Sequence, residues 1–459
     1  MVDLIVHPSG PLRGSVTVPG DKSISHRALL LGALAEGKVR VQGWLPAEDT
    51  KATLRCLANL GIAVDDVTPS DGASALHRHL IVHGGGLDGL REPPDVLDCG
   101  GSGTTMRLLA GILAGQPFTS ILTGNVALRK RPMGRVVDPL RRMGATALAR
   151  NGGQLPPLAI LGGHLCGYDH KLAVASAQVK SAILLAGLFA DGQTIVREPG
   201  PSRDHTEQML RWFGVELEVA AQPGVVSIAG NQHLRPPTDA TLTVPADFSS
   251  AAFPLVAALL VPDSQVSLCG VGTNPTRTGL VDILHAMGAL LTQVTQARVD
   301  TLARIRSAID TEPTTDLQVR ACELDAVDIG GDLVVRAIDE FPIFAIAATQ
   351  ARGITTVRDA SELRVKESDR ISAVTAELRK MGANIEERPD GMLIYGPARL
   401  RGAAVESHRD HRLAMALAVA GLVADGPTLV RDAEVVNDSF PGFVETMQSL
   451  GADIRWTPS

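Results

Sequence analysis

Six times along the chain, an apolar run of helical length leads through a polar or glycine-containing turn into a strand-like run rich in β-branched residues. An apolar run of this length between turn signals is typical of a buried helix, and the shorter β-rich run is typical of a strand. The pattern therefore predicts six helix–strand pairs. They cover residues 28–41, 108–122, 182–196, 253–268, 341–357 and 413–430.

A second element accompanies each pair: an amphipathic helix in which Leu or Met stands four residues before a glycine. Glycine directly after such a helix is the expected left-handed C-terminal cap, so each helix should end there and lead into a strand. The spacing predicts six packed α/β units of roughly 78 residues. The cap positions are Gly61, Gly144, Gly214, Gly288, Gly382 and Gly451.

The six units divide into three and three at the proline-containing stretch 235–239. A chain of 459 residues is long for a single core, so we expect two similar α/β domains. The polar segment 292–316 lengthens one of the units, and it is expected to form an extended surface connection.

Bulk composition excludes several classes of protein. A net charge of -7 argues against nucleic acid or an anionic membrane as the main partner. No apolar run reaches the roughly 18 to 20 residues that a membrane helix needs, and the N-terminus lacks a signal-peptide pattern, so we expect a soluble cytoplasmic protein. The cysteines are scattered and have no CxxC spacing, which argues against a disulfide framework or a zinc site. They are Cys56, Cys99, Cys166, Cys269 and Cys322.

The stretch 19–27 concentrates chemistry at the start of the first apolar helix. Lys22, Arg27 and two serines stand where free N–H groups and the helix dipole favour an anion, so this sequence could hold a phosphate. The alternative is an ordinary helix start, with Asp21 or Ser23 as the cap.

Four more stretches combine charge or glycine with the start of a helix. The glycine-rich turn 98–107 lets backbone N–H groups approach an anion. Residues 128–134 gather three cations, residues 364–370 alternate charges, and residues 410–412 read Asp-His-Arg. Each stretch also has an ordinary explanation as a loop, a solvated face, a surface helix with ion pairs, or a cap.

Together these five stretches resemble the motifs of the 5-enolpyruvylshikimate-3-phosphate synthase family of enolpyruvyl transferases. The resemblance spans essentially the whole chain and implies an α/β fold with two lobes, each of three βαβαββ units forming an inverse α/β barrel. Residues 21–240 would form the N-terminal lobe, and residues 1–20 with 241–459 the C-terminal lobe. The active site would then lie in the cleft between the lobes.

The resemblance implies transfer of the enolpyruvyl group of phosphoenolpyruvate to the 5-hydroxyl of shikimate 3-phosphate, with release of phosphate, by a monomer that needs no metal or organic cofactor. The implied catalytic residues are Asp339, Glu367 and Lys22. Shikimate 3-phosphate would be bound by Lys22, Ser23, Arg27, Ser176, Gln178, Ser202, Arg203, Asp339 and Lys366. Phosphoenolpyruvate would be bound by Lys22, Gly103, Thr104, Arg131, Gln178, Arg370, His411 and Arg412.

Several positions depart from the family pattern or admit a simpler role. Gly101 stands where the family usually has Asn, so one side-chain donor is missing there, and Asp438 replaces a frequent lysine. Arg203 stands where Lys is better known. Helix capping alone would also explain Ser176 and Ser202. A glycine at position 103, by family analogy, keeps room for the donor phosphate and implies sensitivity to glyphosate.

Two other functions remain as alternatives. The sister family transfers the same group to UDP-N-acetylglucosamine, but its pattern has Asn after the first lysine and a loop with a reactive cysteine, whereas Ser23 and residues 128–132 match the shikimate family. The other alternative is a binding protein that holds phosphorylated metabolites without turnover. Retention of Asp339 and Glu367 argues against it.

Overall fold

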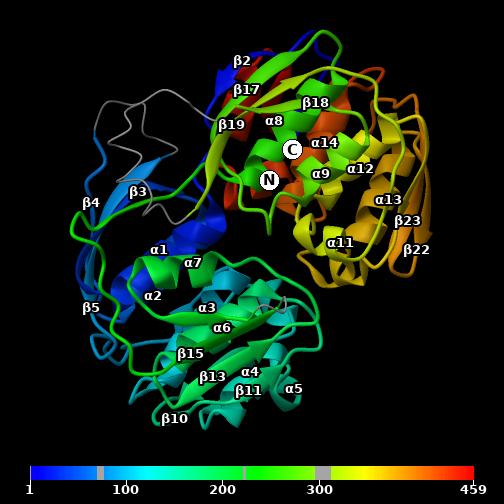
Figure 1. Cartoon of the computed structure of the whole chain (residues 1–459). Coiled ribbons are helices and arrows are strands. Elements are labelled where there is room, and N and C mark those ends of the chain that lie inside the picture. Colours follow the sequence, from blue (N-terminus) through cyan, green and yellow to red (C-terminus); the bar gives the residue numbers. More distant parts are fainter. Residues whose placement is uncertain (1, 70–76, 221–223, 295–311, 459) are drawn as a thin grey trace. The chain divides into compact units, whose positions relative to one another are not determined.

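The computed structural model describes residues 2–69, 77–220, 224–294 and 312–458. These residues form two compact units (Figure 1). Unit 1 contains residues 2–19, 245–294 and 313–458, and unit 2 contains the described residues of 20–244 together with Glu312. Most of the segment 292–316, expected as a surface connection, lies outside the described residues.

The structure divides the chain after residue 244, whereas the sequence suggested a division after residue 240. Strand β16 (Thr241–Thr243) explains the difference, because it pairs in parallel with β3 (Glu36–Trp44) of unit 2. The N-terminal strands behave differently. Strand β2 (Arg13–Val16) pairs with β17 (Gln265–Gly272), which places the start of the chain in unit 1.

Each unit contains three four-stranded sheets among the residues that the structure describes, and each sheet combines one parallel with two antiparallel pairings. In unit 2 the strand orders are β16, β3, β5 (Arg78–Gly85), β4 (Val64–Asp66); β6 (Leu97–Asp98), β7 (Thr119–Thr123), β9 (Leu155–Leu161), β8 (Thr146–Ala149); and β11 (Asp169–Lys171), β13 (Gln193–Arg197), β15 (Val225–Ala229), β14 (Leu217–Val219). Unit 2 also contains a separate two-stranded parallel sheet, β10 (Leu165–Cys166) with β12 (Ala190–Asp191).

Unit 1 repeats this arrangement. Its strand orders are β2, β17, β19 (Thr314–Arg320), β18 (Leu290–Val294); β20 (Asp328–Ile329), β21 (Gly353–Val357), β23 (Gly391–Gly396), β22 (Asn384–Arg388); and β24 (Ala404–Glu406), β25 (Thr428–Arg431), β1 (Val2–Val6), β26 (Ile454–Pro458). The sixth sheet is therefore completed by the first strand of the chain, through antiparallel pairing with β25 and β26.

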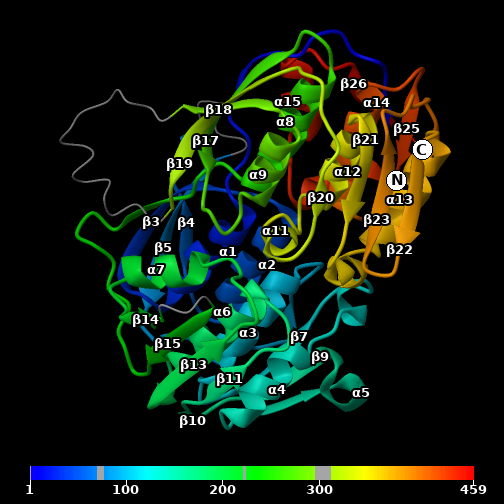
Figure 2. The same ribbon diagram turned by 45° about the vertical axis from the view of Figure 1, so that its right-hand side comes forward.

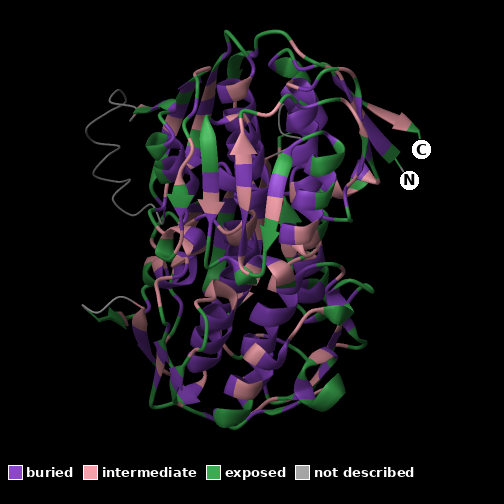
Figure 3. Cartoon of the chain, turned by 90° about the vertical axis from the view of Figure 1, so that its right-hand side faces the viewer, coloured by how far each residue is buried: buried purple, intermediate pink, exposed green. Residues whose placement is uncertain are grey.

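The six predicted apolar helices form the centre of the units, which confirms the six helix–strand pairs. They are buried on nearly every side because they are apolar on nearly every side (Figure 3). Figure 2 shows one of them, α12, beside the strands of its own sheet. These helices are α1 (Lys22–Leu34), α3 (Gly103–Ala114) and α6 (Ala177–Gly187) in unit 2, and α8 (Phe248–Leu260), α12 (Phe341–Gln350) and α14 (His411–Leu422) in unit 1.

The amphipathic helices cover these central helices. They are α2 (Glu48–Asn59), α4 (Gly134–Arg142), α7 (His205–Trp212), α9 (Gly279–Ala286), α13 (Arg370–Lys380) and α15 (Phe443–Ser449). Shorter helical pieces are α5 (Arg150–Gly153), α11 (Asp332–Arg336), η1 (Leu128–Lys130), η2 (Ser361–Val365) and η3 (Ala433–Asp438). No helix within the described ranges is long and apolar enough to cross a membrane.

The prediction of six glycine caps is confirmed. All six glycines have φ between 76° and 111°, a left-handed backbone that ordinary residues adopt only at a cost.

This conformation can be tested at Gly288, where φ is 85° and no heavy atom would lie within 4 Å of an added Cβ. Gly288→Ala should lower the free energy of unfolding by about 1 to 2 kcal/mol through backbone strain alone. Gly10→Ala is the matched control, because its added Cβ also meets nothing within 4 Å but its φ is not in this region. Urea unfolding of both variants measures the difference, and equal stability would contradict the strain.

Candidate active site

The start of α1 orients the first predicted motif. Asp21 caps the helix by accepting from the backbone N–H of Ile24 at 2.9 Å, so the capping interpretation is correct for Asp21. Lys22 Nζ lies 2.5 Å from Asp49 Oδ2, and both side chains are mostly shielded from water. Asp49, which no motif of the sequence singled out, thus fixes the position of the Lys22 ammonium.

Arg27 ties three helices of unit 2 together. It is buried, and it donates to the carbonyl of Ser23 at 2.9 Å, to Ser181 Oγ on α6 at 2.8 Å and to Thr206 Oγ1 on α7 at 2.7 Å. Burial lowers the pKa of its guanidinium to about 10, and the positive charge of Arg203 contributes in the same direction. Arg27 therefore brings a positive charge to the ends of α6 and α7, close to Arg203.

The glycine-rich turn 98–107 brings together several residues that are predicted to bind phosphoenolpyruvate. Gln178 Nε2 donates to Thr104 Oγ1 at 2.9 Å, and Arg107 Nη1 donates to Gln178 Oε1 at 2.5 Å. A Cβ added to Gly103 would lie 2.7 Å from Arg107 Nη1 and 3.0 Å from Arg131 Nη1. Two guanidinium groups thus converge on a backbone without a side chain, which is an arrangement suited to an anion.

Ser176 and Ser202 do not cap helices. Ser176 precedes α6, but its side chain makes no capping bond. Its backbone N–H donates to Glu198 Oε1 at 3.0 Å, and Ser202 Oγ donates to Glu198 Oε2 at 2.9 Å. One buried carboxylate therefore holds both segments, which excludes the capping explanation.

In unit 1, Arg370 is the centre of the predicted charge motif. Its side chain is 1% exposed, and it contacts Asp410 Oδ2 through Nε at 2.8 Å, Glu367 Oε2 through Nη2 at 2.9 Å and Asp339 Oδ1 through Nη1 at 3.5 Å. Burial opposes the charge, but these carboxylates raise the pKa of Arg370 above its ordinary value. The interpretation as a surface helix is wrong for this residue, because Arg370 lies in the core.

Asp410 belongs to this charge cluster and to the start of α14. It accepts from the backbone N–H of Arg412 at 3.0 Å, so the capping interpretation is correct here. Burial works against its ionisation, but the attraction of Arg370 keeps the pKa of Asp410 below its usual range. Asp410 thus holds Arg370 next to the start of α14, where His411 is buried and Arg412 is largely shielded.

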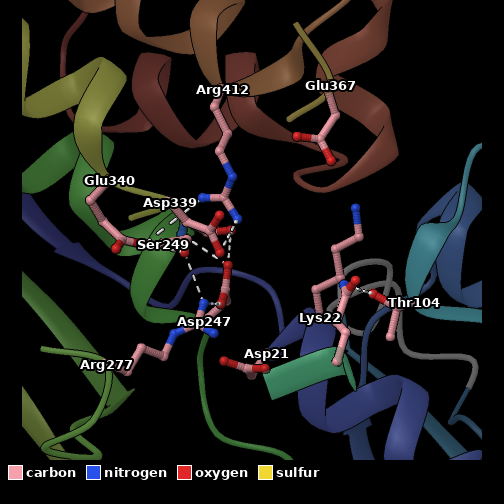
Figure 4. Close-up of polar contacts among 12 residues, drawn as sticks. Asp21, Lys22, Thr104, Asp247, Ser249, Arg277, Asp339, Glu340, Glu367 and Arg412 are labelled. Atoms are coloured by element: carbon pink, nitrogen blue, oxygen red, sulfur yellow. Dashed lines mark hydrogen bonds and ion pairs between the residues drawn. The ribbon is translucent and has the colours of Figure 1, made fainter. Parts of the chain in front are cut away.

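Asp339 and Arg412 face each other at the start of α12, as Figure 4 shows. Arg412 Nη2 lies 3.6 Å from Asp339 Oδ2, and its Nη1 lies 3.9 Å from Glu340 Oε1. Glu340, buried at the helix start without a side-chain cap bond, accepts from Ser249 Oγ. Arg277 donates to the same Ser249 oxygen at 2.8 Å, so a buried hydrogen-bond chain leads to the partner of Arg412.

The sequence-predicted residues thus fall into two groups. Unit 2 holds Lys22, Ser23, Arg27, Gly103, Thr104, Arg131, Ser176, Gln178, Ser202 and Arg203. Unit 1 holds Asp339, Lys366, Glu367, Arg370, His411 and Arg412. Within the described ranges, no group of His, Cys, Asp or Glu side chains is arranged to hold a metal ion.

Sequence reasoning missed the partners that position these side chains. One signal was present: Lys180 is the only charged residue of a mainly apolar helix, and a buried lysine needs carboxylates nearby. Glu198 and Arg277 gave no such signal, because neither stands inside an apolar helix. Gly101, where a donor is missing, lies at an exposed position of the turn.

Known proteins resemble this chain over nearly its whole length. The model of the family described as EPSP synthase (3-phosphoshikimate 1-carboxyvinyltransferase) matches residues 6–447. A 3-phosphoshikimate 1-carboxyvinyltransferase of Desulforamulus reducens is 49% identical over 98% of this chain and 99% of its own length. The enzyme of that name from Geotalea uraniireducens is 51% identical over 97% and 98%.

Solved structures of related enzymes match the fold of this chain. An EPSP synthase from Acinetobacter baumannii superposes with a TM-score of 0.84 at 40% identity, covering 100% of both chains. The enolpyruvyl transferase NikO from Streptomyces tendae has a TM-score of 0.77 at 20% identity, covering 100% of this chain and 99% of its own, which shows the shared fold.

The buried pair of Arg370 and Asp410 should be costly to break. Asp410→Ala leaves a buried guanidinium without its main partner and should lower the free energy of unfolding by about 3 to 5 kcal/mol. Asp425→Ala is the control, because its partner Arg399 is 85% exposed, and it should cost less than about 1 kcal/mol. Chemical denaturation compares them, and similar losses would contradict the buried-pair argument.

Proposed function

The chain belongs to the EPSP synthase family, and from this premise we propose how its residues divide the reaction. The enzyme transfers the enolpyruvyl group of phosphoenolpyruvate to the 5-hydroxyl of shikimate 3-phosphate and releases phosphate. This reaction is the sixth step of the shikimate pathway, which leads to chorismate and the aromatic amino acids. The family assignment favours this acceptor over UDP-N-acetylglucosamine, and turnover over mere binding.

The reaction is an addition followed by an elimination. The 5-hydroxyl oxygen attacks C2 of phosphoenolpyruvate and loses its proton, while C3 gains one, which gives a tetrahedral intermediate. Loss of a proton from C3 and of phosphate from C2 then restores the double bond. The protein must supply a base, an acid and stabilisation of the departing phosphate.

Asp339 and Glu367 carry the proton transfers in this proposal, with Lys22 as the third catalytic group. The observation that supports it is their shared partner, since buried Arg370 contacts both carboxylates. A nearby fixed positive charge favours the ionised form of a carboxylate, so one of the two can take the proton of the 5-hydroxyl. Arg412, 3.6 Å from Asp339, adds a second cation.

Binding of the substrates is assigned by the same reasoning. Each substrate carries a phosphate and a carboxylate, and guanidinium groups match both in bidentate fashion. Phosphoenolpyruvate is held by Lys22, Gly103, Thr104, Arg131, Gln178, Arg370, His411 and Arg412. Shikimate 3-phosphate is held by Lys22, Ser23, Arg27, Ser176, Gln178, Ser202, Arg203, Asp339 and Lys366.

Three further properties belong to the proposal. The enzyme acts as a monomer, as the family resemblance implies, and size-exclusion chromatography tests this. It works in the cytoplasm, where the free thiols of buried Cys56 and Cys99 stay reduced. Glyphosate inhibits it, because Gly103 leaves the space beside two arginines open.

The role of Asp339 is tested by its removal. Asp339→Ala should reduce phosphate release from phosphoenolpyruvate in the presence of shikimate 3-phosphate by about 100-fold or more, because a proton-transfer group is lost. Calorimetric binding of shikimate 3-phosphate should weaken only modestly. A variant that turns over normally once saturated, but binds the acceptor poorly, would contradict the catalytic assignment.

The donor site is tested by filling the space at Gly103. In Gly103→Ala the new methyl group would press on Arg107 and Arg131, so the KM for phosphoenolpyruvate should rise by about tenfold, the usual effect of misplacing a binding group by a fraction of an ångström. Inhibition by glyphosate should weaken as well. The KM for shikimate 3-phosphate should change little, and an equal rise in both KM values would contradict the assignment.

A further inference from the structure

A buried lysine lies at the start of α6, where its neighbours in the helix are apolar or small. Lys180 Nζ lies 2.9 Å from Glu198 Oε2 and 2.8 Å from Glu207 Oε1. The three side chains are between 1% and 5% exposed. One ammonium is therefore shared by two carboxylates, one from the end of β13 and one from α7.

Glu198 is also the residue that holds the two serine segments. Its Oε1 accepts from the backbone N–H of Ser176 at 3.0 Å, and its Oε2 accepts from Ser202 Oγ at 2.9 Å. Lys180 reinforces the second segment by donating to the carbonyl of Ser202 at 3.4 Å. The lysine and the glutamate thus fix both segments at once.

The negative charge of Glu198 would repel a phosphate bound at the two serine segments. A phosphate dianion bound at Ser176 and Ser202 would lie near the negative charge of Glu198, and like charges repel strongly where water is excluded. Lys180 offsets that charge, and burial raises the pKa of Glu207, the second carboxylate on the same ammonium. Although burial works against its ionisation, Glu207 and Glu198 raise the pKa of Lys180 above its ordinary value, so the ammonium remains charged.

We propose that Lys180 and Glu198 are positioning residues for the phosphate of the acceptor. Glu198 anchors the segments of Ser176 and Ser202 by accepting from the Ser176 amide and the Ser202 hydroxyl, and Lys180 holds Glu198 in place and weakens its repulsion of the incoming dianion. The inference rests on the roles proposed above for Ser176 and Ser202. Neither Lys180 nor Glu198 touches the reacting atoms.

The first test replaces the lysine by an apolar residue of similar length. Lys180→Met should raise the KM for shikimate 3-phosphate by about 30-fold or more, from the lower end of the usual effect of truncating one partner of a buried charge pair. The KM for phosphoenolpyruvate and kcat at saturation should stay within about threefold, a small change on that scale. Lys171→Met, at an exposed position of the same unit, is the control for the loss of one charge.

A double variant separates positioning from mere structural support. In Lys180→Met/Glu198→Gln no uncompensated carboxylate remains at position 198, and the Gln amide can still accept from Ser176 and donate to Ser202 Oγ. This variant should bind shikimate 3-phosphate more tightly than Lys180→Met. A double variant no better than the single one, or a single variant that raises both KM values equally, would overturn the proposal.

Two further variants complete the experiment. Glu198→Gln alone can keep both hydrogen bonds, and it should change the KM for shikimate 3-phosphate more than that for phosphoenolpyruvate. This test applies even if Lys180→Met does not fold, and equal effects on the two KM values would count against the proposal. Ser202→Ala tests the premise. If it leaves acceptor affinity unchanged, the assigned role of Ser202 fails, whereas failure of the lysine variants alone rejects only the positioning role.

Discussion

A buried cation shared between carboxylates is the interaction on which both units depend. Arg370 in unit 1 and Lys180 in unit 2 each lie at the start of a helix, almost fully buried, between acidic side chains from other elements. A buried ion pair contributes little net stability, but removing one partner is costly. Each cluster therefore specifies one arrangement of its helix ends.

This arrangement explains why the units can present so much charge at the ends of apolar helices. The bodies of α6 and α14 are packed in the core and cannot shift without disturbing many contacts. Charges attached to their first turns are consequently held in place, and their hydrogen-bond donors and acceptors point in fixed directions. Rigid support of this kind reduces the reorganisation that a reaction would otherwise require.

The sequence predicted the repeating architecture well, because that architecture depends on local signals. Apolar runs and cap glycines recur in each of the six α/β repeats, and all six caps adopt the expected backbone. The partners of the functional side chains were not predictable in the same way. Asp49 meets Lys22, and Glu198 meets Lys180, only because the chain folds back on itself, and no spacing in the sequence records such pairing. The charged stretch 364–370 illustrates the limit, since its alternating charges also allowed a surface helix, whereas tertiary packing buries Arg370.

The departure from the family pattern at Gly101 shows how a missing side chain can be misjudged from sequence. Asn125 donates its backbone N–H to the carbonyl of Gly100 at 2.8 Å, and its Oδ1 accepts from the N–H of Leu128 at 2.9 Å, so its side chain is held in one orientation. In that orientation Asn125 Nδ2 lies 3.2 Å from the point where a Cβ of residue 101 would stand. An amide donor from the following loop therefore lies beside the position where the sequence lacks one. Residue-by-residue comparison records the loss of a side-chain donor at Gly101, but the folded chain retains a polar group there. For a bound anion, the place of a donor in space matters, and its position in the sequence does not.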